Sequence, residues 1–116
     1  MGNRALIVPR ALALAGTHRE ADIHEGVASG RFQSWAEGDS TIITEVLETP
    51  LRRTLNFFLA EGTMPELQAV VPAILDWARM HGCTHASLSG RKGWSRVAWL
   101  KESGWTEGGV IMEREL

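Results

Sequence analysis

The sequence predicts one α/β domain built on a mixed sheet, with helices on both faces. Three observations predict it. Strand-type and helix-type patterns alternate along the chain, three strand-type segments follow one another in the first half, and a long amphipathic helix separates them from the later strands. Strands that follow one another directly pair as an antiparallel meander, whereas strands joined through a helix pair in parallel. The expected order is strand, helix, three strands, helix, strand, helix, strand.

The chain is expected to begin with an edge strand and a helix. Residues 6–8 form a short apolar, partly β-branched run that Pro9 ends by removing a backbone donor, which favours an edge strand. Apolar residues then recur at helical spacing as far as Gly30, the expected stop. Thr17 is the expected N-cap of this helix, with Glu20 completing a capping box.

Three strands are expected next. Phe32 and Trp35 precede a Gly-Asp turn, and the β-branched segment 41–48 follows it, so these two segments are predicted to be hairpin partners. Residues 53–62 carry apolar side chains on both faces, which predicts a central strand covered on both sides. The alternation places Leu55, Phe57 and Leu59 on one face and Asn56, Phe58 and Ala60 on the other.

The helix between Thr63 and Gly82 has the clearest sequence pattern. Thr63 and Glu66 form a capping box around Pro65, and apolar residues then follow a 3.6-residue period. Pro72 lies inside that pattern, so we expect a bend or a later start of the helix. A short strand in 84–90, a helix in 91–104 and a closing strand in 105–116 are expected to complete a single domain spanning residues 1–116.

Composition narrows the classes of function. A formal net charge of −2 gives no broad positive field, so neither nucleic acid nor an anionic membrane is an expected partner. Cys83 is the only cysteine and requires no oxidising compartment, and no apolar run approaches the ~20 residues that cross a bilayer. These features predict a soluble protein of a reducing cytoplasm.

The element order and the ending AWLKESGWTEGGVIMEREL resemble the C-terminal half of the Gcn5-related N-acetyltransferases, the GNAT family. In that family the last helix commonly ends in a phrase like FYEKLGF, and a strand carrying G…M…K.L follows; residues 99–105 and 112–116 occupy these places. The segments STIITEVLETP and LNFFLAEG also resemble the central hairpin of small GNAT-like proteins encoded in the structural gene modules of tailed bacteriophages. The resemblance implies a GNAT-like fold with a shortened N-terminal half.

The chain departs from the family pattern where acetyl-CoA is bound. The family holds the cofactor's pyrophosphate with a Q/R-x-x-G-x-G/A loop, whose backbone N–H groups cradle the anion at a helix N-terminus. Residues 60–66 stand in that place, and only Gly62 fits. Pro65 has no N–H, and Glu61 and Glu66 bring negative charge to the phosphate position. A carboxylate ~4 Å from a phosphate costs on the order of 4 kcal/mol at an effective dielectric constant near 20.

The chain also lacks the family's usual general acid, which is the tyrosine of FYEKLGF. Leu100 stands at that position, the chain contains no tyrosine, and Ser103 is the only residue of the phrase that offers a proton. Together these departures predict that no cofactor is bound.

Other candidate site residues have ordinary interpretations beside functional ones. Arg91 and Lys92 could hold an anion at the start of a helix, although a turn with solvated basic residues is the favoured interpretation. Glu45 on the central hairpin could be a general base, and is otherwise a polar sheet residue. The five tryptophans are expected to build core or interface. Trp94 and Trp99 are five residues apart and cannot share one narrow helix face, so at least one is an interface candidate.

No metal site is expected. Two sets of residues have a spacing that could suit metal ligands. The favoured interpretation of the first set, in the first predicted helix, is a solvated helix face. The favoured interpretation of the second set, around Cys83, is ordinary polar or core residues. The sets are His18, Asp22 and Glu25, and His81, Cys83 and His85.

The sequence thus favours a noncatalytic structural or interaction protein with an acyltransferase-like fold, such as a phage virion or virion-assembly component. Its expected partner is another protein or a second copy of itself, and its place is the cytoplasm or a virion. The alternative is an atypical acetyl-CoA-dependent N-acyltransferase, in which Arg91 and Lys92 contact the cofactor phosphates and Glu45 deprotonates an amine. A third possibility is a small-molecule binding module that uses the opening between the two central strands.

Overall fold

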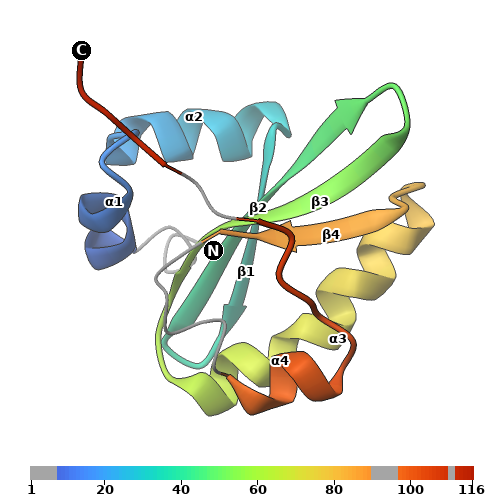
Figure 1. The fold of residues 1–116 in the computed structure, drawn as a ribbon. Coiled ribbons are helices and arrows are strands. Elements are labelled where there is room, and N and C mark those ends of the chain that lie inside the picture. Colours follow the sequence, from blue (N-terminus) through green and yellow to red (C-terminus); the bar gives the residue numbers. More distant parts are fainter. Residues whose placement is uncertain (1–7, 90–96, 110–111) are drawn as a thin grey trace.

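The structure is a computed structural model that describes residues 8–89, 97–109 and 112–116. Its sheet has four strands in the order β1-β2-β3-β4, in which β1, β2 and β3 are antiparallel neighbours and β3 and β4 form a parallel pair at one side (Figure 1). The helices are α1 (Pro9–Ala15), α2 (Glu20–Ser29), α3 (Met64–Met80) and α4 (Ala98–Glu102). The strands are β1 (Phe32–Glu37), β2 (Ser40–Thr49), β3 (Arg52–Glu61) and β4 (His85–Leu88). This mixed sheet with helices on both faces confirms the predicted fold class.

Two cores lie on opposite faces of the sheet. The core beneath α3, here the α3-side core, contains Ile42, Leu55, Phe57, Leu67, Val71, Ile74 and Ala78. The core beneath α1 and α2, here the α2-side core, contains Val8, Ile23, Phe32, Ile43 and Leu59. The central strands β2 and β3 therefore carry apolar residues on both faces, as the sequence predicts for β3.

A β-bulge in β3 divides its side chains between the two cores. Ile43 pairs with Leu59 and Thr44 pairs with Phe57, so Phe58 is an extra residue in β3. The bulge puts Phe58 and Leu59 on the same face, so the alternation reverses after Phe58. Phe57 then packs under α3 and Leu59 under α2, and the prediction that both share one face is wrong.

The first helices differ from their predicted positions. Val8 is 1% exposed and precedes α1, so the edge strand predicted for residues 6–8 is wrong at its one described residue. Pro9 begins α1 because its fixed φ suits a first helical turn and its missing N–H has no helical partner there. α2 begins at Glu20 with Arg19 as N-cap, whose N–H donates to the Asp22 carboxylate at 2.8 Å. Thr17 is therefore not the cap.

The long helix α3 follows its prediction closely. Thr63 is its N-cap, and the helix continues without interruption through Pro72 to Met80, so a later start is excluded. Pro72 is exposed, which leaves room for its ring on the outer side of the helix.

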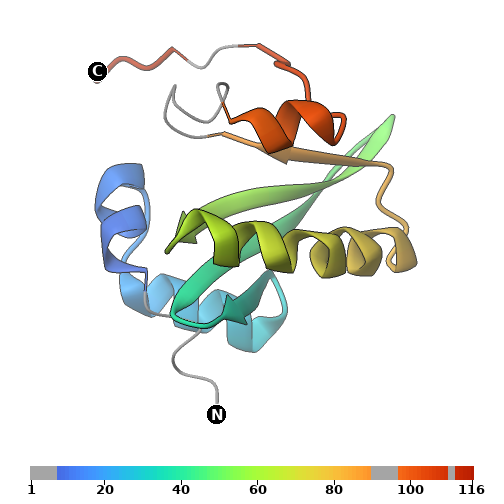
Figure 2. The same cartoon turned by 90° about the horizontal axis from the view of Figure 1, so that it is seen from below.

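The C-terminal region contains less regular structure than predicted. Of the helix predicted in 91–104, residues 98–102 form α4, and residues 90–96 lie outside the described part of the chain. Residues 105–109 and 112–116 form no strand, and the latter run away from the sheet (Figure 2). Met112 and Leu116 are 89% and 110% exposed, and the charged residues between them leave no apolar face to bury.

Candidate functional site

The loop between β3 and α3 is closed by a hydrogen-bond network that starts from β2. The Thr63 N–H donates to Ser40 Oγ at 3.0 Å, and Ser40 Oγ in turn donates to Glu66 Oε1 at 2.6 Å. The Thr63 hydroxyl donates to the same Glu66 oxygen at 3.2 Å. The predicted Thr63–Glu66 capping box is therefore wrong, because the Thr63 N–H bonds Ser40 and the Thr63 side chain bonds no backbone N–H of the helix. Ser40, which is 2% exposed, links the two residues instead.

Two glycines make room for this network. A Cβ on Gly62 would lie 1.9 Å from Ser40 Oγ, and the φ of Gly62 is +141°. A Cβ on Gly38, in the β1–β2 turn, would lie 1.8 Å from Glu66 Oε2. Gly62, the one residue that fits the family's phosphate loop, therefore has a structural reason for being glycine.

The first turn of α3 does not fit a pyrophosphate. The Glu66 carboxylate already lies at this helix terminus, where negative charge is favourable. The Thr63 N–H is used by Ser40, and Pro65 has none to offer. An incoming phosphate would have to displace Glu66 or lie beside it.

Glu61 does not contribute to this obstruction, which corrects the expectation from the sequence. Its Oε1 accepts hydrogen bonds from the Arg10 N–H at 2.8 Å and the Ala11 N–H at 3.0 Å. The carboxylate thus holds the first turn of α1 against the end of β3. Of the two predicted acidic obstacles, only Glu66 contacts the first turn of α3.

A second hydrogen-bond network connects three polar side chains on β2, β3 and β4. Asn56 Nδ2 donates to Glu45 Oε2 at 3.0 Å, and Ser87 Oγ donates to Asn56 Oδ1 at 2.9 Å. The three residues are neighbours in register across β2, β3 and β4, and all are half-buried. This polar chain holds the Glu45 carboxylate in a fixed direction, with Glu45 opposite Phe32 of β1.

Aromatic rings lie beside Glu45. The His18 ring, in the loop between α1 and α2, contacts Phe58 edge-to-face at 4.8 Å and Phe32 at 5.9 Å. Phe58 is the bulged residue, and the β3–β4 pairing ends one residue earlier, at Phe57 and Leu88. β3 continues to Glu61 without β4, so the bulge, the rings and the Glu45 carboxylate come together where the two parallel strands stop pairing.

Four of the six residues in the two suggested metal sets have separate partners. His18 packs on phenylalanine rings, whereas Asp22 caps α2. His81 stacks on Trp77 at 4.0 Å, and His85 Nδ1 contacts Thr84 Oγ1 at 2.8 Å. Within residues 8–89, 97–109 and 112–116, no group of three such side chains could hold an ion.

The remaining candidates lie around α4. Leu100 is 6% exposed and has no proton to give, and the Ser103 hydroxyl donates to the Trp99 carbonyl at 2.6 Å. Trp99 is half-buried, with its indole N–H directed at Met64 Sδ at 3.2 Å, so it is partly core as well as an interface candidate. Arg91, Lys92 and Trp94 lie outside the described residues.

Comparison with known proteins places the fold. Wild-type TTHA1254 from Thermus thermophilus matches with a TM-score of 0.62 and 16% identity over 94% of this chain and 89% of that one. A "probable acetyltransferase" matches with a TM-score of 0.61 and 12% identity over 97% of this chain and 87% of that one. The chain has a GNAT-like fold. The apo aminoglycoside antibiotic 6'-N-acetyltransferase AAC(6')-IG from Acinetobacter haemolyticus matches over 100% of this chain and 96% of that one, with a TM-score of 0.55 and 16% identity.

At these identities the likeness shows the GNAT-like fold alone. No sequence-family model and no curated protein matches the chain. Among the described residues, no helix is both long and apolar enough to span a membrane.

Proposed function

We propose that this chain is a noncatalytic structural or interaction protein that keeps a GNAT-like fold and does not use acetyl-CoA. The observation that carries the proposal is the Glu66 carboxylate at the first turn of α3, held by the hydroxyls of Ser40 and Thr63. A protein of this kind acts through a partner protein or a second copy of itself. More specifically, we propose that it is a component of a phage virion or of virion assembly. This part of the proposal rests on the sequence resemblance of the central hairpin.

The α4 residues at the family's general-acid position support the same proposal. Leu100 stands where that acid would be, and the neighbouring Ser103 hydroxyl is bonded to the helix backbone. A transferase needs a group to protonate its leaving thiolate, and neither of these two side chains has a free proton to give.

Acetyl-CoA is expected to show no saturable binding up to about 1 mM, which corresponds to a binding free energy weaker than about −4 kcal/mol. Tryptophan fluorescence would follow the titration and calorimetry would check it. Glu66→Gln removes the charge from the first turn of α3, and Glu25→Gln removes the same charge from the exposed face of α2 as a control. Binding gained by the Glu66 variant alone would identify that carboxylate as the obstacle. Micromolar binding by the unaltered protein would overturn the proposal.

An atypical N-acyltransferase is the second candidate, favoured by the Glu45–Asn56–Ser87 chain beside the point where β3 and β4 stop pairing. In that function Glu45 would accept the proton of an acceptor amine, while Asn56 fixes the direction of its carboxylate. If so, Glu45→Gln should lower acetyl transfer to a primary amine by about 10²–10⁴-fold, as for loss of a general base. Mass spectrometry of the amine would measure the rate, with the exposed Glu37→Gln as control. Equal rates in both variants, or no transfer by the unaltered protein, would exclude this candidate.

A further inference from the structure

A groove lies between α3 and the C-terminal region, on the side of α3 that faces away from Trp35 and Trp77. Its α3 wall is a stripe of residues at helical spacing, about 16 Å long at 1.5 Å per residue. Its other wall comes from α4 and the residues that follow it, and the groove, which is open to solvent, has a volume of about 490 Å³. The lining residues are Gln68, Val71, Pro72, Leu75, Asp76, Arg79, Trp99, Glu102, Ser103 and Trp105.

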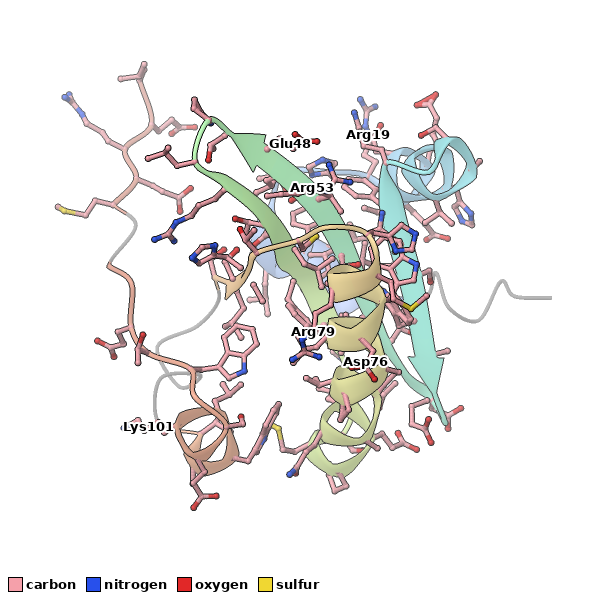
Figure 3. The ribbon with its side chains drawn as sticks, turned by 90° about the vertical axis from the view of Figure 1, so that its right-hand side faces the viewer. Arg19, Glu48, Arg53, Asp76, Arg79 and Lys101 are labelled. Atoms are coloured by element: carbon pink, nitrogen blue, oxygen red, sulfur yellow. The ribbon has the colours of Figure 1, made fainter. Side chains whose placement is uncertain are left out.

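The charge inside this groove is negative. Among the described residues, Arg79 is the only cation that lines the groove. Its Nη1 donates to Asp76 Oδ1 of the same helix at 2.9 Å, and Figure 3 shows the two side chains next to each other. Lys101 is not among the lining residues. Glu102 lines the groove and has no hydrogen-bond or ion-pair partner among the described residues. One exposed carboxylate that no described cation neutralises therefore faces the groove.

Two indoles line the same groove as that carboxylate. The Trp99 N–H is held by Met64 Sδ at 3.2 Å, and the Trp105 ring contacts Phe57 edge-to-face at 5.7 Å. Both side chains are half-buried, so each is anchored in the α3-side core and still lines the groove. Indole faces attract cations and cover apolar groups, a pairing that suits one ligand class.

We propose that this groove binds a small organic cation with an aromatic or branched apolar body. The cationic head pairs with Glu102, and the body lies on Pro72 and Leu75 between the two indoles. Anionic ligands are disfavoured, because Arg79, the one cation among the described lining residues, is already paired. The site is separate from the β3–α3 loop and does not depend on the function proposed above.

Phenethylamine is a suitable probe, with 2-phenylethanol and phenylacetate as neutral and anionic compounds of similar size. The amine is expected to bind saturably near 1 mM, and about fivefold more tightly than the alcohol, as one partly exposed charge contact provides. In an ¹H–¹⁵N spectrum assigned by Trp→Phe variants, it should shift the indole N–H signals of Trp99 and Trp105. The signals of Trp35 and Trp77, which do not line the groove, should stay in place.

Glu102→Gln should remove the fivefold preference for the amine and leave alcohol binding unchanged. Glu107→Gln, which removes an exposed carboxylate that does not line the groove, should keep the preference. Thermal unfolding would confirm that both variants stay folded. The proposal is wrong if phenethylamine shifts neither indole signal at about ten times the expected dissociation constant, or if the Glu102 variant retains the preference. Equal binding of the amine and phenylacetate by the unaltered protein would also overturn it.

Discussion

Replacing Gly62 with alanine is expected to lower the free energy of unfolding by about 4 kcal/mol. The φ of +141° is strained for any residue with a Cβ, at about 1–3 kcal/mol. The new Cβ would also meet Ser40, with Oγ at 1.9 Å and the backbone Cα at 2.6 Å, and overpacking of this kind adds about 1–3 kcal/mol. Urea unfolding followed by tryptophan fluorescence would measure the loss.

Gly30→Ala is the matched control for this prediction. Gly30 ends α2 with a φ of +84°, and a Cβ there would meet no heavy atom within 4 Å. Only the cost of the left-handed conformation applies, about 1 kcal/mol. Equal losses in the two variants would show that Gly62 is needed for its φ alone. Because the φ of Gly62 can cost up to about 3 kcal/mol by itself, a loss above that value would support the close contact with Ser40, and with it a structural explanation of this glycine in place of a phosphate-binding one.

Local patterns in the sequence predicted the elements that are stabilised locally. The β1–β2 hairpin forms around the Gly38-Asp39 turn, and α3 begins at its Thr63 cap, because turn and cap preferences depend on neighbours only a few residues away. Pro9 was interpreted as the end of a strand, whereas it starts a helix. The same fixed φ suits both, and the contact of α1 with Glu61, some fifty residues away, is one that no local pattern reveals.

The residues of the candidate site that lie close together in sequence could be predicted from local patterns, and the others could not. Glu66 and Gly62 were located in the right loop, since both are close to the helix start in sequence. The role of Ser40 was not foreseen, because its partner Thr63 is 23 residues away and no local pattern marks the contact. Glu61 was assigned to the wrong helix terminus, since charge and position in the chain do not reveal the direction of a side chain. Sequence alone thus places Glu66 at the start of α3 but does not reveal the network that holds its carboxylate.

The bulge at Phe58 is the feature that most changes the arrangement of the central strands, and it can be tested through Leu59. Leu59 is 4% exposed and lies in the α2-side core with Ile23, on the face opposite Ile74 of α3. Leu59→Ala is expected to lower the free energy of unfolding by about 3 kcal/mol through the cavity it leaves. Chemical denaturation would measure this value.

Two double-mutant cycles then show on which face of the sheet the Leu59 side chain lies. Leu59→Ala should couple to Ile23→Val by about 0.5–1 kcal/mol, as residues in one cluster do, and be additive with Ile74→Val. Leu55→Ala provides the matched control with the opposite pattern, because Leu55 is 0% exposed and packs in the α3-side core. If both leucines coupled to Ile74, they would share one face, as unbroken alternation predicts, and β3 would have no bulge. Phe58 would stay beside His18 in either case, because alternation from Phe57 alone already puts it on the α2 side, so this test concerns the face of Leu59.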